Sequence, residues 1–283
     1  MKKIITVKHL TKEFGNKKVI DDLNFNISEG EFTAFLGENG AGKSTTISIL
    51  TTLLKPTYGQ VSINGFQFGR DDAKIRRQIG VVFQSSILDS LLTPKEILIS
   101  RGKLYNLTNE EILNRLTELK NLLNMNSFFN RHYGLLSGGQ RRKVDIARAL
   151  IHKPAILFLD EPTTGLDPTS RKLVWNAITK LQKSQHLTIF LTTHYLEEVE
   201  SANKVIIIHY GKLKAIGTPT ELKKKFAKNT LDVWINGIKE TRHFSNSKDV
   251  IKYLNENLNR IDDFEYRHSS MNEVFFNVTK ETD

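Results

Sequence analysis

The chain has 283 residues with no cysteine, a hydrophobic share of 39% and a charged share of 25%, which suits a globular protein without disulfides in a reducing compartment. No run approaches the roughly 18 to 20 apolar residues that cross a bilayer, so any action at a membrane requires a partner that spans it. The formal charge of +10 indicates either attraction to anions or a lysine-rich solvated surface, and the lack of a dense basic run with interleaved aromatic residues argues against nucleic-acid binding.

The first 65 residues alternate short β-like runs with turns. Predicted strands lie at 4–10, 19–27, 31–36 and 59–65. The N-terminal stretch 1–10 lacks the apolar core and cleavage site of a signal peptide, so none is expected. A helix is predicted at 44–54, stopped before Pro56.

The stretch "GENGAGKS" at 37–44 fits G-x-x-x-x-G-K-[ST] between a predicted strand and a predicted helix. Its glycines allow backbone N–H groups to turn inward around phosphates, and the helix N-terminus adds partial positive charge. Lys43 can reach the terminal phosphates of ATP, and the Ser44 hydroxyl can ligate Mg²⁺. The nucleotide-binding residues predicted in and beside this turn are Gly37, Asn39, Gly40, Ala41, Gly42, Lys43, Ser44 and Thr45.

The chain then changes character. A strand-like run at 77–84 ends in Gln84, whose side-chain carbonyl could reach a metal ion or a water, although a surface glutamine is the plain alternative. The pattern at 94–126 is helical, with Thr108 and Glu111 forming a capping box. This block interrupts a β-rich chain and indicates an inserted helical subdomain at about 85–150.

A second glycine-rich turn opens a helix at "LLSGGQRRKVDIARAL", residues 135–150. Ser137 and Gln140 form a capping box, which explains the helix start without a ligand. Gly138 and Gly139 are poor helix formers whose benefit would be close backbone approach, and a helix N-terminus prefers an anion. From these residues alone, a well-capped helix and a second phosphate site remain equally good interpretations.

Polar side chains follow two later strands, predicted at 155–160 and 187–194. We expect the first to lie beside the strand that leads into the phosphate turn, which places Asp160 to hold Mg²⁺ through water. Glu161 points elsewhere and could polarise an attacking water as general base. His194 ends the other strand, where ligands bind in open α/β sheets. An acidic turn and a surface histidine are the alternatives.

Alternating strands and helices predict a mostly parallel sheet covered on both faces. A strand pair is expected at 204–217, after a short helix at 195–202. From residue 220 onward, 11 basic residues balance 11 acidic ones, so the positive excess lies earlier. We therefore expect a main domain at 1–220 and a small α+β appendix at 221–283.

The phosphate turn, Gln84, "LSGGQ", "FLDEPTTGLD" and "TTH" occur in the order and approximate spacing of the nucleotide-binding subunits of ABC transporters, which residues 1 to about 220 resemble. The resemblance implies an ABC-type P-loop NTPase of the α/β class, with a mostly parallel core sheet, an antiparallel β subdomain and a helical insertion. It implies that two chains pack head to tail, each ATP lying between one phosphate turn and the partner's Ser137, Gly138, Gly139 and Gln140. It also implies that Asp167 crosses the interface, that His194 contacts the γ-phosphate and that Phe14 stacks on adenine.

Within this family, residues 137–168 and the ending "SSMNEVFFNVT" resemble ATP-binding proteins of bacterial drug exporters of the daunorubicin-resistance type, although Met271 and Asn272 depart from that ending. The resemblance implies an ATPase bound peripherally at the cytoplasmic face of the cell membrane. Its partners would be an integral membrane permease and a second ATP-binding subunit, most simply an identical chain, and no nucleic acid is expected. The rival interpretation is a soluble ABC-type ATPase with a regulatory, nucleic-acid-linked or ribosome-linked role.

Overall fold

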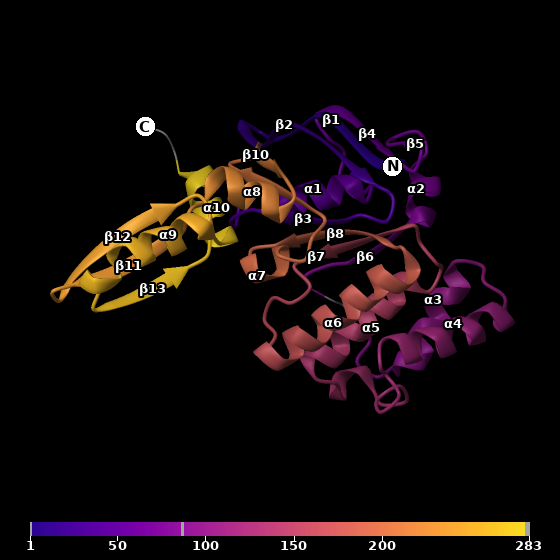
Figure 1. Ribbon diagram of the computed structural model, residues 1–283. Helices are drawn as coiled ribbons and strands as arrows, with labels where there is room; N and C mark the ends of the chain where they lie inside the picture. Colours follow the sequence, from indigo (N-terminus) through magenta and orange to yellow (C-terminus); the bar gives the residue numbers. More distant parts are fainter. Residues whose placement is uncertain (1, 86–87, 281–283) are drawn as a thin grey trace.

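A six-stranded sheet forms the centre of the computed structural model, which describes residues 2–85 and 88–280. Its order is β10-β9-β3-β8-β7-β6, and all neighbours are parallel except β9 with β10. The strands are β3 (Phe32–Leu36), β6 (Ile79–Val82), β7 (Ile156–Asp160), β8 (Thr188–Thr193), β9 (Lys204–His209) and β10 (Lys212–Gly217). β3, β7 and β8 are buried along their whole length because layers cover both faces of the sheet (Figure 1).

An antiparallel sheet of order β2-β1-β4-β5 and helix α1 cover one face. The elements on this side are β1 (Lys3–Phe14), β2 (Lys17–Ser28), β4 (Tyr58–Ile63), β5 (Phe66–Gln67), α1 (Lys43–Leu50) and α2 (Asp72–Gln78). Phe35, Phe158 and Phe190 project toward this layer from three central strands, and the ring of Phe190 lies 5.2 Å from that of Phe35 and 5.6 Å from that of Phe158. This aromatic core holds together the strands whose carboxyl ends carry the candidate site.

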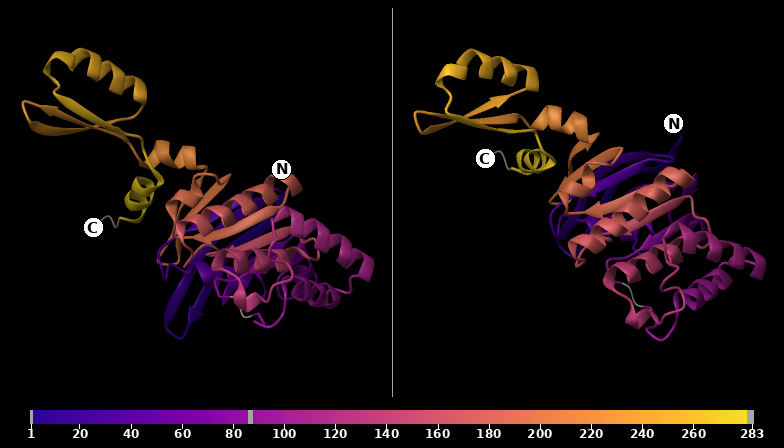
Figure 2. Two further views of the ribbon diagram at one scale, coloured as in Figure 1. Left: turned by 90° about the horizontal axis from the view of Figure 1, so that it is seen from below. Right: turned by 60° about the horizontal axis from the view of Figure 1, so that its bottom comes forward.

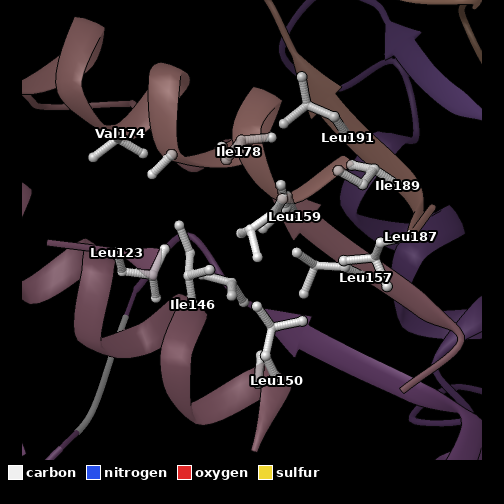
Figure 3. Packing of buried hydrophobic residues seen from close by; sticks show 14 of the residues in the cluster. Leu123, Ile146, Leu150, Leu157, Leu159, Val174, Ile178, Leu187, Ile189 and Leu191 are labelled. Carbon is white, nitrogen blue, oxygen red and sulfur yellow. The ribbon is translucent and has the colours of Figure 1, made fainter. Parts of the chain in front are cut away.

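Helices cover the other face. They are α3 (Pro94–Leu104), α4 (Asn109–Leu122), α5 (Gly138–Leu150) and α6 (Pro168–Gln185), with a 3₁₀ turn η1 (Tyr133–Leu135) before α5. Because strand side chains alternate, Leu157 and Leu159 point away from Phe158 and pack with Ile146 and Ile178 of the helices (Figure 3). Apolar side chains at helical spacing in α4 and α5, and in the residue that ends each helix, are buried, namely Ile112, Leu116, Leu119, Leu123, Val144, Ala147, Leu150 and Ile151.

The C-terminal part forms its own small sheet of order β12-β11-β13, which projects from the rest (Figure 2). Its elements are β11 (Asn229–Ile235), β12 (Ile238–Phe244), α9 (Ser247–Asn257), η2 (Leu258–Arg260) and β13 (Asp263–Arg267). Helices α8 (Pro219–Phe226) and α10 (Met271–Thr279) precede and follow it in the chain, and the short α7 (Leu196–Val199) lies between β8 and β9. Leu231, Val233 and Val250 form a separate core under α9. Leu222 of α8 and Val274 of α10 instead join the main core, so the last helix folds back onto the larger part of the chain.

One expectation about the sheet was wrong. β7, which ends in Asp160, does not lie beside β3, because β8 pairs with both and separates them. The order follows from pairings between strands far apart in sequence, which no local pattern reveals. The carboxylate and the phosphate turn therefore face each other across the end of an intervening strand.

Two element boundaries also differ from the sequence prediction. α1 ends at Leu50 and not at residue 54, because Thr52 adopts a left-handed conformation with φ of 63° that a helix cannot continue through. The run at 77–84 starts as the end of α2, and only Ile79–Val82 are strand. Within residues 2–85 and 88–280, no helix combines the length and apolar character that crossing a membrane requires.

Candidate functional site

The phosphate turn joins β3 to α1 and depends on its glycines. Gly40 and Gly42 have φ of 82° and 102°, which favour glycine. A Cβ on Gly42 would come within 2.9 Å of the carbonyl oxygen of Val19, so a larger residue does not fit. Because Gly42 is the N-cap, no side chain caps the first N–H groups of α1. They are thus available to an anion.

Lys43 is buried at the centre of this turn. Its Nζ donates to the carbonyl oxygens of Gly37 at 2.9 Å and Glu38 at 3.1 Å, and it lies 3.1 Å from Glu161 Oε1. The ammonium group is therefore held by a carboxylate in the position where a phosphate would compete for it. An anion that entered the turn would have to take over this contact.

Asp160 and Ser44 meet although 116 residues separate them. Asp160 Oδ1 accepts hydrogen bonds from Thr192 Oγ1 at 2.6 Å and from Ser44 Oγ at 3.3 Å. Hydroxyl, carboxylate and amide oxygens are ligands that suit Mg²⁺, and Gln84 supplies an amide beside the same cavity. Among the described residues no cluster of three or more His, Cys, Asp or Glu could hold a metal alone. The donors Ser44, Gln84 and Asp160 therefore fit an ion that also takes phosphate and water oxygens.

Glu161 leaves the end of β7 in a left-handed conformation, with φ of 45°. Its N–H donates to the carbonyl and the hydroxyl oxygens of Thr192, both at 3.1 Å, and these bonds hold the turn. The turn aims the carboxylate between Lys43 and His194, whose Nδ1 lies 3.2 Å from Glu161 Oε2. A non-glycine residue in this conformation costs about 1 to 3 kcal/mol, a strain that often marks functional sites.

A cavity of about 330 Å³ lies above these groups. It is lined by Val19, Asn39, Gly40, Gly42, Lys43, Ser44, Thr45, Gln84 and Glu161. Phe14 lies in the same β1–β2 hairpin as Val19; the residue is 49% exposed, and Lys12 Nζ lies 4.9 Å from the centre of its ring. The hairpin that contributes Val19 to the cavity thus also carries an exposed aromatic side chain, as stacking on a nucleotide base would require.

The second glycine turn, at residues 137–140, does not line this cavity. Ser137 caps α5 and forms the predicted box with Gln140. A Cβ on Gly139 would come within 2.9 Å of Ser170 Cβ, so a contact within the chain already favours glycine there, whereas one on Gly138 would meet only the Leu166 side chain, at 2.9 Å. Ser170 belongs to α6, whose N-cap is the exposed Asp167. Residues 137–140 therefore share a surface with Asp167 and are not among the residues that line the 330 Å³ cavity.

Glu198 is a buried residue of this region that sequence reasoning missed. It accepts hydrogen bonds from Thr193 Oγ1 at 2.6 Å and from Thr163 Oγ1, so it connects the turn after Glu161 with the residue before His194. Burial raises the pKa of Glu198, against the lowering effect of the two hydroxyls. The sequence offers only its spacing of four residues from His194, which does not by itself indicate that Glu198 is buried.

Glu198→Gln tests this pKa. The pKa of Glu198 is higher in the folded protein than in the unfolded chain, where it has its ordinary value of 4.5. The free energy of unfolding therefore decreases as the pH rises through the interval between these two pKa values. The variant should lose that decline in urea unfolding measured from pH 4 to pH 8, because its amide can pair with both hydroxyls without titrating. Glu197→Gln, an exposed neighbour, is the control. Equal pH profiles for the wild type and Glu198→Gln would contradict the assignment.

Comparisons with known proteins agree with this geometry. Residues 20–164 match the family model described as "ABC transporter". The linearmycin resistance ATP-binding protein LnrL of Bacillus subtilis is 35% identical, over 84% of this chain and 76% of its own. The doxorubicin resistance ATP-binding protein DrrA of Mycobacterium tuberculosis is 38% identical, over 78% and 67%.

Two solved structures show the fold. A dimeric ATP-binding cassette in a post-hydrolysis state with ADP and phosphate has a TM-score of 0.67 at 31% identity and covers 76% of this chain and 98% of its own. CbiO1 of Clostridium perfringens, part of the ABC transporter complex cbiONQ, has a TM-score of 0.73 at 27% identity and covers 92% and 97%. The expected α/β class, with its parallel core, antiparallel sheet, helical region and C-terminal α+β part, is confirmed.

Proposed function

The chain belongs to the ABC transporter family as an ATP-binding subunit that hydrolyses ATP, and from this premise we propose that it drives a membrane exporter of small molecules by ATP-dependent closure of a dimer. The names of the resistance proteins that it resembles support export of a drug or an antibiotic. The dimeric cassette with ADP and phosphate supports the closing dimer.

One observation carries the proposal: the chain has two phosphate-suited turns, and the cavity at the first is not lined by the second. A nucleotide bound at the phosphate turn leaves Ser137, Gly138 and Asp167 free to meet a nucleotide on another chain. Head-to-tail pairing with a two-fold axis would complete two such sites at once. ATP then forms part of the interface, so its binding favours closure and its hydrolysis favours opening.

The ion pair between Lys43 and Glu161 supports a simple order of events. When a triphosphate enters the turn, the Lys43 ammonium group exchanges its contact with Glu161 for contacts with the phosphate oxygens, which frees the Glu161 carboxylate. The free carboxylate then accepts a proton from the attacking water as the new bond to the γ-phosphorus forms and the bond to the leaving ADP oxygen breaks. His194, 3.2 Å from the same carboxylate, is placed to contact the γ-phosphate.

The remaining site residues supply positioning. Phe14 stacks on the adenine, and the N–H groups of residues 40–45 hold the phosphates. Ser44, Gln84 and Asp160 would hold Mg²⁺, which neutralises charge on the phosphate oxygens. Asp167 and the residues 137–140 act toward the partner's nucleotide.

We place the permease contact next to Gln84. Phe83 lines a groove of about 170 Å³ whose rim carries Arg76, Arg101 and Arg148. An acidic or aromatic segment of the permease suits these cations, and its movement would reach the nucleotide through Gln84. The chain would then lie peripherally on the cytoplasmic side of the membrane, with 1–220 as the nucleotide-binding domain and 221–283 as an accessory unit.

Arg76→Glu should weaken association with the permease by about tenfold, because a charge reversal opposes an acidic partner. Binding of ATP should not change, since Arg76 is exposed on α2 and not among the residues lining the nucleotide cavity. The effect is measured by using the variant to pull down the permease from detergent extracts. Arg77→Glu is the matched control, being an exposed neighbour that is not among the residues lining the groove. Equal retention by both variants would remove this contact from the proposal.

Affinity purification of the tagged chain from detergent-solubilised cells tests the function itself. A co-purifying protein with several membrane spans is the expected result. Recovery with ribosomes or nucleic acid, and without such a protein, would favour a regulatory or nucleic-acid-linked ATPase and would overturn the exporter proposal.

A further inference from the structure

Arg142 joins two segments that serve different parts of the site. It lies on α5, five residues after Ser137, and its side chain is buried, with only 8% exposed. Its Nη1 donates to the carbonyl oxygen of Phe83 at 2.7 Å and its Nη2 to that of Gln84 at 2.9 Å. The guanidinium group therefore spans two successive carbonyls of the loop after β6.

This contact restrains orientation as well as position. A guanidinium group is planar and presents its donors in a fixed fork, so two bonds to adjacent carbonyls fix how the loop faces the helix. Asp145 Oδ2, one turn further along α5, lies 3.8 Å from Nη1 and partly balances the buried charge. Because both acceptors are backbone atoms, the link holds Gln84 in place without engaging its side chain, which remains available at the nucleotide cavity.

The second glycine turn begins the same helix, just before Arg142. Helices transmit displacements as rigid rods, and Ser137 lies just over one helical turn from Arg142. In the dimer proposed above, Gln84 faces the nucleotide of its own chain, whereas Ser137 and Gly138 face the nucleotide of the partner. We propose that Arg142 is a positioning residue that couples the two nucleotide sites. Because it bonds the carbonyls of Phe83 and Gln84, the position of the glycine turn at 137–140 depends on what Gln84 contacts. The inference rests on the proposed function.

Arg142→Lys tests the coupling in the full chain carrying Glu161→Gln, because lysine keeps the charge beside Asp145 but cannot bridge both carbonyls. Dimerisation in saturating Mg-ATP, measured by sedimentation, should weaken by about tenfold or more. Affinity for ADP should change less than about twofold, since ADP lacks the γ-phosphate on which the partner's glycine turn is proposed to close. Arg141→Lys is the matched control, since its Nε bonds Leu136 of its own segment.

A double-mutant cycle separates coupling from general loosening of the fold. In a Gln84→Ala background, Arg142→Lys should cause little further loss, because the contact that it transmits is already gone. Dimerisation of Arg142→Lys equal to that of Arg141→Lys, or an undiminished loss in the Gln84→Ala background, would overturn the inference. If the Glu161→Gln parent itself did not dimerise, this would instead contradict the proposal that two chains share each nucleotide site. If circular dichroism shows that Arg142→Lys does not fold, Arg142→Gln is measured in the same assays.

Discussion

Glu161→Gln is expected to lower ATP turnover by at least about 10²- to 10⁴-fold, the usual contribution of a general base, while ATP binding persists and the closed dimer accumulates. Glutamine keeps the shape of the side chain but cannot accept a proton from the attacking water. The left-handed turn that aims this side chain is held by backbone bonds to Thr192, so the substitution should leave the turn in place. Steady-state phosphate release and sedimentation in Mg-ATP measure the two effects.

The ion pair of Glu161 adds an expectation to this experiment. Because Lys43 must leave the carboxylate before it meets a phosphate, the uncharged variant should bind ATP at least as tightly as the wild type. Glu197→Gln, which makes the same chemical change three residues after His194, should keep normal turnover. A substantial ATPase rate in Glu161→Gln would contradict the assignment of the base.

The positions of the candidate site residues in the fold were predictable because each lies at or next to the end of a short, strongly patterned segment. Lys43 and Ser44 follow an apolar strand in a glycine-rich turn, and Asp160 and His194 end two further apolar strands. The carboxyl ends of parallel strands meet at one edge of a sheet, so local patterns already brought these side chains together. The same reasoning could not order the strands, and it wrongly placed β7 beside β3.

The burial of two residues held by long-range contacts was not predictable. Glu198 looks like one acidic residue among several on a short helix, and only the fold buries it against Thr163 and Thr193. Arg142 is one of two adjacent arginines, and only the fold turns it inward while Arg141 stays exposed. Thr163 lies 35 residues before Glu198, and Phe83 and Gln84 lie 59 and 58 residues before Arg142, and neither helical nor strand periodicity reports such pairings.

The glycines of the second turn show how a sequence argument can have two answers. Poor helix formers at a helix start suggested close approach to a ligand, yet Ser170 of the same chain already leaves little room for a side chain at Gly139. The capping box of Ser137 likewise explains the helix start internally. A phosphate role for this turn therefore needs a test that depends on two chains.

Mixing two inactive variants provides that test. Lys43→Ala removes the cation that meets the phosphates, and Gly138→Asp places a carboxylate where the partner's phosphates are proposed to lie. The added Cβ of Gly138→Asp meets only the Leu166 side chain, which can shift. Each variant alone should lose at least about 99% of its ATPase activity, because both sites of a symmetric dimer carry the defect.

In a mixed dimer, the intact phosphate turn of the Gly138→Asp chain meets the intact glycine turn of the Lys43→Ala chain. One normal site forms and the other carries both defects. An equal mixture should therefore recover up to about a quarter of the wild-type rate, since half of the dimers are mixed and each has one of two sites. Sites confined to single chains predict no recovery at any ratio, so a mixture with no activity, under conditions where sedimentation shows mixed dimers, would contradict sharing of the nucleotide. Recovery that rises and falls with the mixing ratio would show that neither chain hydrolyses ATP with its own two turns.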